Sequence, residues 1–565
     1  MSDPRSSTAM LLRNSRPLRP RLTRPEIRAM SFAKPRLQAA EIPGPAGGVA
    51  AGLRDLFAPL DGLLTCGGDP RLALDRARLN AYGCGPSPSP DIWSFASSTA
   101  STISERAYAR AGLAREELLR AAIDVGLDEA FDTRIEAMRA ELKACLELPN
   151  DVAVIFSASG TDAQLHALFL ARCRSEAVLT TIVVGCDQTG SGTFHTARGR
   201  HFANLTARGS VVGKDAPIPG LSCDSMGLPL FDGTAGCAAR ADIDDAVLRA
   251  IEAAVAGGSD VLLHIMDSSK LGWGAPGAAC LADIGRRWPQ RVQVVVDACQ
   301  MRLTRTRLQN YLDRGYMVLI SGSKFFGGPA FSGALLLPGC IPCPRGDAFA
   351  DSLKDYAGRS DWPKGWTLRS QLSNRPNLGQ WLRWEAALEE IGAYYSVPAD
   401  FRTFALRQLH DGVESLIARS PSLDPVMASG PACGSDDEEF SCPTIFPFMI
   451  RRRGMPISAD ECQLLYRALA RDVRELVVGS ARNQEIAGRR CLLGQPVRVD
   501  GAQPTAVLRL CLGARQVIEA WAPDPGLAQQ RLQGELDRIA ALLAKLELVL
   551  DRMGELRSTE LSHGV

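Results

Sequence analysis

Lysine is scarce in this sequence. Of the 64 basic residues among 565, eight are lysine and the other 56 are arginine. Any chemistry that requires a lysine amine therefore has few candidate positions, whereas no arginine stands out by residue type alone. The lysines stand at positions 34, 143, 214, 270, 324, 354, 364 and 545.

An excess of charge is absent too. The basic residues oppose 63 acidic ones, which leaves a formal net charge of +1. This balance argues against a protein that binds nucleic acid over its whole surface and against a polyanionic solvating protein. No run approaches the ~18 consecutive apolar residues that a membrane helix needs. We therefore expect a globular, cytoplasmic protein with neither a nucleic-acid nor a membrane partner.

Metal-ligand patterns are also missing. The six histidines show no pairwise metal spacing, and the 16 cysteines include one Cys-x-x-Cys, at Cys340 and Cys343. A four-ligand zinc site would need a second such pair nearby. We therefore expect no metal site. The scattered cysteines are expected to serve as small apolar residues or as free thiols in a reducing compartment.

Composition divides the chain into four segments. Residues 1–50 are rich in Arg and Pro and poor in acids. Such a start can resemble an organellar transit peptide, but prolines at 17, 20, 25 and 35 interrupt any amphipathic helix, which favours a flexible tail. Residues 51–148 have mainly helical patterns, with a polar stretch at 97–102. A large domain at 149–380 precedes a smaller α+β domain at 381–565 with a terminal helix.

Short apolar runs recur in the large domain, at 152–156, 178–184, 261–266, 292–296 and 316–320. They are β-branched and continuous, which is typical of buried parallel strands. Helical patterns lie between several of them, at 161–174, 242–256 and 278–288. Strands that alternate with helices predict an α/β fold with a mainly parallel sheet sandwiched by helices.

The carboxyl ends of such strands are where ligands bind. Ser159, Gly160 and Thr161 follow the first run and open a helix, where free backbone N–H groups can hold a phosphate, although Ser159 or Thr161 could simply cap it. Asp297 follows the run at 292–296. A buried acid at this position must be stabilised by a cationic group, by a metal ion or by the N–H groups of a helix that it caps. Lys324 follows the run at 316–320. Taken by itself, this lysine is also consistent with a solvated side chain in a loop.

In this order the three motifs resemble the pyridoxal-phosphate enzymes of the aspartate aminotransferase (fold type I) superfamily, over about residues 150–345. Asp297-Ala-Cys-Gln300 and Ser321-Gly-Ser-Lys324 are most similar to the class V branch, which includes cysteine desulfurases, aminotransferases and lyases. The resemblance implies that Lys324 binds the cofactor's aldehyde, and that Asp297 pairs with its pyridine nitrogen. That pairing makes the ring an electron sink.

The resemblance also assigns the remaining contacts of pyridoxal 5'-phosphate. Gln300 would hydrogen-bond the 3-hydroxyl oxygen, and a stacking ring is expected at His195, with His201 as the alternative. The phosphate would be held by Ser159, Gly160, Thr161, Ser321 and Ser323.

Two other basic residues enter by the same resemblance. Arg509 is the one charge in an apolar strand pattern at 505–513, and related enzymes bind the substrate carboxylate with a late arginine. Lys270, the rival lysine, has no strand-end acid at a suitable distance before it, so we expect it to line the site instead. Asn374 and Asn377 lie in a segment that resembles a loop of class V enzymes, and in those enzymes the loop reaches a neighbouring subunit.

The implied function is that of an enzyme acting on an amino acid through an external aldimine and a Cα carbanion, as a homodimer. Transamination is our first hypothesis. The alternative is a lyase, a decarboxylase or a carbon–carbon bond-forming enzyme, because one cofactor cradle serves all of them. A cysteine desulfurase is less expected, since no cysteine stands in a matching motif, and so is a cofactor-free binding protein. The stretch at 97–102 could shape the substrate pocket.

Overall fold

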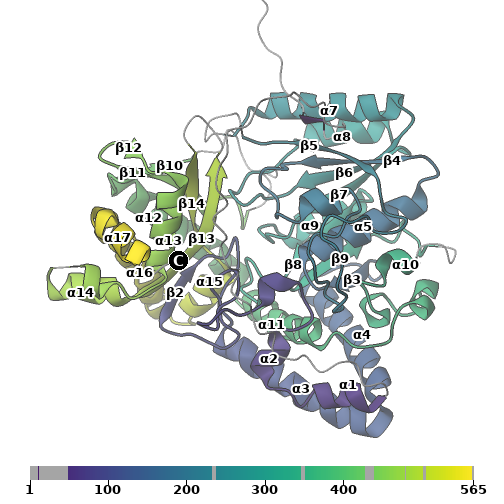
Figure 1. Cartoon of the computed structure of the whole chain (residues 1–565), viewed down its shortest axis with the longest axis horizontal. Coiled ribbons are helices and arrows are strands. Elements are labelled where there is room, and N and C mark those ends of the chain that lie inside the picture. The colour runs from purple at the N-terminus through teal and green to yellow at the C-terminus, as the bar shows by residue number, and fades with distance from the viewer. Residues whose placement is uncertain are drawn as a thin grey trace, which may run out of the picture.

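The computed structural model describes residues 10–11, 49–231, 237–344, 350–426, 438–477, 479–499 and 504–562. The predicted tail at 1–50 thus lies almost wholly outside the described residues. Two sheets organise the described chain, with the larger one on the right of Figure 1 and the smaller one on the left.

The larger sheet has the strand order β1-β5-β4-β6-β7-β8-β9-β3. Strands β5, β4, β6, β7 and β8 are parallel, and β9 is antiparallel to both of its neighbours, so β3 points the same way as the five. The carboxyl ends of these six strands therefore meet at one edge. The bounds are β1 (Met10–Leu11), β3 (Ala153–Ser157), β4 (Leu179–Val184), β5 (Asp224–Leu228), β6 (Asp260–Met266), β7 (Val292–Asp297), β8 (Met317–Ser321) and β9 (Gly333–Leu337).

Helices cover both faces of this sheet. Because successive strand residues point to opposite faces, Ile320 packs in the cluster that includes α7, α8, α9, α3, α4 and α11, whereas Leu319 packs in the cluster that includes α5. The predicted α/β fold with a mainly parallel sheet between helices is thus confirmed. The bounds are α3 (Glu105–Val125), α4 (Leu127–Leu146), α5 (Gly160–Arg174), α7 (Arg240–Ala256), α8 (Ala278–Arg287), α9 (Arg305–Asp313) and α11 (Leu378–Tyr395).

The smaller sheet has the order β10-β11-β14-β13-β2, with β12 paired to β11. Its last strand, β2 (Ile92–Phe95), lies in the segment predicted to be mainly helical and runs parallel to the first residues of β13. The N-terminal segment is therefore built into the C-terminal sheet. The other bounds are β10 (Leu423–Pro425), β11 (Ile445–Arg452), β12 (Met455–Pro456), β13 (Arg490–Val499) and β14 (Thr505–Cys511).

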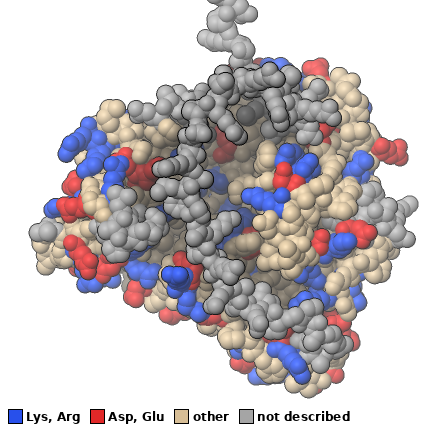
Figure 2. All heavy atoms as spheres, in the orientation of Figure 1, with Lys and Arg blue, Asp and Glu red and all other residues tan. Residues whose placement is uncertain are grey.

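The remaining helices pack around these two sheets. Among the helices of the described residues, none combines the length and the apolar character that a membrane crossing needs. On the face seen in Figure 2, basic and acidic side chains are interspersed. The bounds are α1 (Val49–Asp55), α2 (Leu60–Leu64), α6 (Thr193–Thr196), α10 (Ala350–Leu353), α12 (Ala399–Arg419), α13 (Ala459–Leu469), α14 (Ala481–Gly488), α15 (Ala514–Ala520), α16 (Pro525–Asp551) and α17 (Met553–Ser562).

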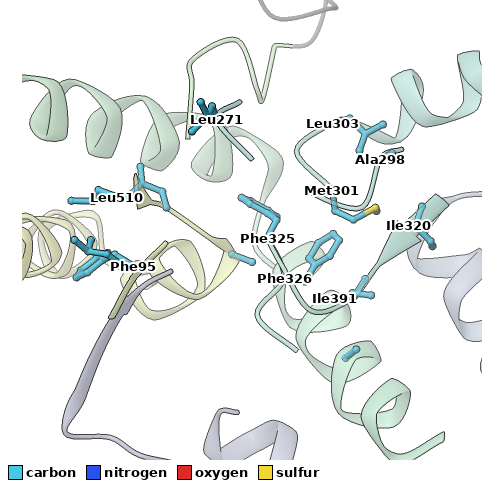
Figure 3. Packing of buried hydrophobic residues seen from close by; sticks show 14 of the residues in the cluster. Phe95, Leu271, Ala298, Met301, Leu303, Ile320, Phe325, Phe326, Ile391 and Leu510 are labelled. Carbon is cyan, nitrogen blue, oxygen red and sulfur yellow. The ribbon is translucent and has the colours of Figure 1, made fainter. Parts of the chain in front are cut away.

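One hydrophobic core joins the two sheets. Phe95 of β2 and Leu510 of β14 belong to the same buried cluster as Ile320 of β8. Between them in Figure 3 lie the rings of Phe325 and Phe326, which are separated from the end of β8 by three residues. Both rings are fully buried, so the segment after β8 is held where the two sheets meet.

A buried arginine on α11 ties the N-terminal segment to the larger domain. Arg383 is 0% exposed, and its guanidinium donates to the carbonyl oxygens of Leu64, Cys66, Gly67 and Phe331 at 2.5–3.1 Å. Burial lowers the pKa of Arg383 to about 10. The four neutral acceptors thus stabilise the charged form in place of water.

We expect Arg383→Met to lower the free energy of unfolding by about 3 kcal/mol, because the substitution leaves several buried carbonyl oxygens without a donor. Urea denaturation followed by tryptophan fluorescence would measure the loss. The matched control is Arg286→Met, since the Arg286 side chain is 77% exposed. Equal denaturation midpoints for the two variants would contradict this assignment.

Candidate active site

A cavity of about 550 Å³ lies at the carboxyl edge of the larger sheet and is closed on one side by β13 and β14. It brings together residues that are far apart in the sequence. Apart from the stacking ring, the predicted cofactor ligands all line it, together with the predicted substrate arginine: Ser159, Gly160, Thr161, Asp297, Gln300, Ser321, Ser323, Lys324 and Arg509.

The first part of the wall is the N-terminus of α5. Ser159 is the N-cap, and its Oγ accepts from the backbone N–H of Asp162 at 3.2 Å, so the capping role considered from the sequence is real. The N–H groups of Gly160 and Thr161 begin the helix and have no carbonyl partner within it. A Cβ at position 160 would lie 2.7 Å from Sγ of Cys299. Glycine therefore lets the helix end approach the loop after β7, which creates an anion-binding corner.

A carboxyl group stands directly behind this corner. Asp162 is buried, and its side chain is hydrogen-bonded to the Ser159 hydroxyl. Burial, followed by the nearby charge of Asp69, raises the pKa of Asp162 to about 7. Near neutral pH this carboxyl is therefore partly protonated, which reduces its repulsion of an anion at the helix end.

The loop after β7 supplies an acid and an amide. Oδ1 of Asp297 accepts from the backbone N–H of Cys299 at 3.1 Å, which fixes the carboxylate at the strand end. Nε2 of Gln300 donates to the carbonyl oxygen of Ser98 at 3.1 Å. Oε1 of Gln300 is buried with no hydrogen-bond partner among the described residues. This loop therefore brings a carboxylate to the cavity and leaves one buried amide oxygen of a lining residue without a hydrogen-bond partner.

The loop after β8 supplies the lysine. Ser321 Oγ donates to the carbonyl oxygen of Cys299 at 3.0 Å and lies 3.3 Å from the Ser323 hydroxyl. Lys324 follows and is half-buried; within the described chain, no acceptor lies within hydrogen-bond distance of its amine. The buried rings of Phe325 and Phe326 anchor the backbone immediately after it (Figure 3). An amine held at its base and without a partner at its tip can react with a ligand.

The opposite wall comes from β14. Arg509 is 1% exposed, and its guanidinium donates to the carbonyl oxygens of Lys270 (3.1 Å) and Gln495 (2.5 Å) and to Thr99 Oγ1 (3.2 Å). The Gln495 carbonyl is available because β13 bulges between Gly494 and Val497. Burial lowers the pKa of Arg509, and its Nε lacks a partner in the described structure.

Several cavity residues were not predicted as ligands. Arg71 lines the wall near Phe331, with its Cζ 4.7 Å from the ring centroid, and its Nη2 is paired with Asp69 at 2.5 Å. No sequence signal separates it from the other arginines. Ser98 and Thr99 also line the cavity, as expected for the stretch at 97–102.

The predicted stacking histidine is not in the cavity. His195 is absent from the described lining residues; its Nδ1 lies 3.0 Å from Oδ1 of Asp215. Two residues along a helix rotate a side chain by about 200°, and on α6 it is Thr193 that lines the cavity. The alternative, His201, is buried with its Nδ1 2.7 Å from the hydroxyl of Tyr356. The structure thus assigns neither ring to the site.

Three further expectations concern the surroundings. Lys270 lines the cavity, as predicted. The side chain of Asn374 donates to Asp128 at 2.7 Å, and that of Asn377 caps α11 by accepting from Gln380 N–H at 3.1 Å, so both are used within their own chain. Among the described residues no group of three or more His, Cys, Asp or Glu side chains could hold a metal ion.

Comparisons with known proteins give structural likenesses only. No protein-family model matches the sequence, and no curated protein matches it. A solved NifS-like protein is 14% identical, with a TM-score of 0.46 over 80% of this chain and 99% of its own. Oryza sativa TDC with PLP and tryptamine is 14% identical, with a TM-score of 0.43 over 90% and 92% of the two chains. The cysteine desulfurase CsdA from Escherichia coli is 14% identical, with a TM-score of 0.43 over 80% and 94%. At these values, the strand order and the cavity residues remain the basis for assigning a function.

Proposed function

We propose that the chain is a pyridoxal-phosphate-dependent enzyme that acts on an amino acid, and that it catalyses transamination. The observation that carries the proposal is the meeting of Lys324, Asp297 and the α5 N-terminus in one cavity. These are a reactive amine, an acid and an anion-binding corner, and each stands after a different strand of the larger sheet.

The donor set of the cavity fits this cofactor. The N–H groups at Gly160 and Thr161, with the Ser323 hydroxyl, offer hydrogen-bond donors for a phosphate. The vacant Oε1 of Gln300 can accept from a ring hydroxyl. The Asp297 carboxylate can accept from a protonated ring nitrogen. When bound, the cofactor supplies an electron-withdrawing ring that acidifies the Cα–H bond of an amino acid.

The protein groups have separate tasks in this reaction. Asp297 keeps the ring nitrogen protonated by pairing with its positive charge. Lys324 Nζ accepts the proton from Cα of the substrate and later gives a proton back as the product forms. Arg509 binds the α-carboxylate, because a planar guanidinium and a carboxylate form paired hydrogen bonds. The N-terminal segment contributes Ser98 and Thr99 to the cavity wall, where it limits the access of water.

The absorption spectrum of the purified chain tests this proposal. After incubation with pyridoxal phosphate and dialysis, we expect a band at ~420 nm, a general property of this cofactor bound to a lysine amine. A mixture of amino acids should then give a keto acid and convert the cofactor to its amine form. A colourless protein that cannot be reconstituted would refute the proposal, and release of carbon dioxide in place of a keto acid would replace transamination by decarboxylation.

A further inference from the structure

Two basic side chains, the buried Arg509 and the half-buried Lys270, stand on one wall of the cavity. Nη1 of Arg509 donates to the backbone oxygen of Lys270 at 3.1 Å, so the two residues are in direct contact. Nζ of Lys270 donates to the carbonyl oxygen of Thr189 at 2.5 Å. All these acceptors are neutral. Within the described residues neither basic group has a carboxylate within 4.0 Å.

The acids nearest to this wall have other partners. The charge of Asp297 acts on Lys270, but Asp297 accepts from the backbone N–H of Cys299 and is assigned to the ring nitrogen of the cofactor. Asp69 is paired with Arg71. Asp187 lines the cavity, but its two carboxylate oxygens accept from the backbone N–H groups of Leu230 and Phe231 at 2.9 Å each. Two neighbouring cations in a largely buried wall, neither of them paired with an acid, are costly unless a ligand supplies negative charge. An α-carboxylate on Arg509 would balance only one of them.

An unsatisfied amide adjoins the same wall. Gln188 is 1% exposed and lines the cavity, and both polar atoms of its side chain lack a hydrogen-bond partner in the described structure. It directly precedes Thr189, the residue that holds Lys270. Buried side-chain amides are almost always paired, so the Gln188 amide is suited to bind a polar group of a ligand.

We propose that Lys270 and Gln188, next to Arg509, form a subsite for a second acidic group, so that the substrate is an amino acid with an anionic side chain. This inference rests on the proposed function for the α-amino group and for the α-carboxylate at Arg509. Lys270 supplies the charge and the Gln188 amide a hydrogen bond to one oxyanion. Side-chain carboxylates, phosphates and sulfonates share that chemistry.

The charges around Lys270 predict a proton linkage. Burial, followed by the positive charges of Arg509 and Lys324, lowers the pKa of Lys270 to about 7, against the opposing charge of Asp297; Arg71 lowers it further. An anion bound beside the amine favours its charged form. Above the pKa of Lys270 in the free protein, binding should therefore take up a proton, and affinity should fall as the pH rises through and beyond that value.

Calorimetry with two unreactive acids tests the subsite on the cofactor-loaded protein. Succinate carries two carboxylates, whereas its monoamide, succinamate, carries one. We expect wild type to bind succinate about 10- to 100-fold more tightly, the contribution of one charge-assisted contact. At about pH 8, binding of succinate should be accompanied by uptake of a fraction of a proton by the protein, seen as a buffer-dependent enthalpy. Lys270→Met should bring the two affinities within about threefold and abolish the proton uptake.

Three further variants make the outcome decisive. Lys354→Met is the matched control, since Lys354 has a 62% exposed side chain and should keep the full succinate preference. Arg509→Met should weaken both acids alike. Gln188→Leu should reduce the preference about fivefold even if Lys270→Met fails to fold. Equal affinities in wild type, or an unchanged preference in both Lys270→Met and Gln188→Leu, would overturn the subsite. If the protein shows no ~420 nm band after incubation with pyridoxal phosphate and still prefers succinate, the proposed function would be overturned while the anion subsite would stay in place.

Discussion

Replacing Lys324 with alanine should abolish the ~420 nm band and reduce turnover by about 10⁴-fold, because one substitution removes both the amine that binds the cofactor and the group that moves the Cα proton. The loop should keep its shape, since Ser321 is bonded to the carbonyl of Cys299 and the rings of Phe325 and Phe326 are buried. The loss would therefore be chemical rather than structural.

Spectra and single-turnover rates of Lys324→Ala, with and without added methylamine, would measure this effect. A small external amine can partly replace a missing one, so partial recovery of turnover is expected. Lys354→Ala serves as the control, because that lysine lies outside the cavity. Retention of the band by Lys324→Ala would show that another lysine, with Lys270 the first candidate, holds the cofactor.

Asp297→Asn should lower turnover by about 10²- to 10³-fold while the cofactor stays bound, since the change removes one preorganised electrostatic interaction from the reacting system. Asparagine matches aspartate in size, and its side-chain oxygen can still accept from the Cys299 N–H. What it cannot do is hold a positive charge on the ring nitrogen.

The Asp297 experiment separates binding from catalysis. The ~420 nm band and the cofactor dissociation constant report binding, whereas the decay of that band after substrate addition reports proton removal. Asp187→Asn is a useful comparison, because Asp187 lines the same cavity but is bonded to backbone N–H groups. A rate for Asp297→Asn equal to that of wild type would contradict the assignment of Asp297.

The parts of the fold that were predictable have strong local signals. Strands β3, β4, β6, β7 and β8 are continuous apolar runs, and their buried positions demand such residues. Strand β5 was missed because Asp224-Ser-Met-Gly-Leu228 lies near the sheet edge and carries few apolar residues. Strand β2 was missed because its partner is β13, and a pairing across so much sequence leaves no local pattern.

The candidate site divides in the same way. Its loops follow predictable strands, so Ser159, Asp297 and Lys324 could be placed at one sheet edge from the sequence. His195 could not, because the direction of a side chain on the short helix α6 depends on which face meets α5, and Gln164 of α5 is bonded there to Thr193 and Thr196. Gln188 could not be predicted from the sequence either, because a side-chain amide lacks a partner only by virtue of its three-dimensional surroundings.

The parallel pairing of β2 with β13 has a consequence for the order of folding. The contact that closes the cavity, from the backbone N–H of Gln495 to Thr99 Oγ1, spans 396 positions. Closing so large a loop costs chain entropy before any contact is gained. During synthesis the larger sheet can form before β13, the partner strand of the N-terminal segment, has been made. The cavity is therefore among the last parts of the molecule to be completed, and a chain that ends before β13 would have the lysine, the acid and the phosphate corner without an enclosed site.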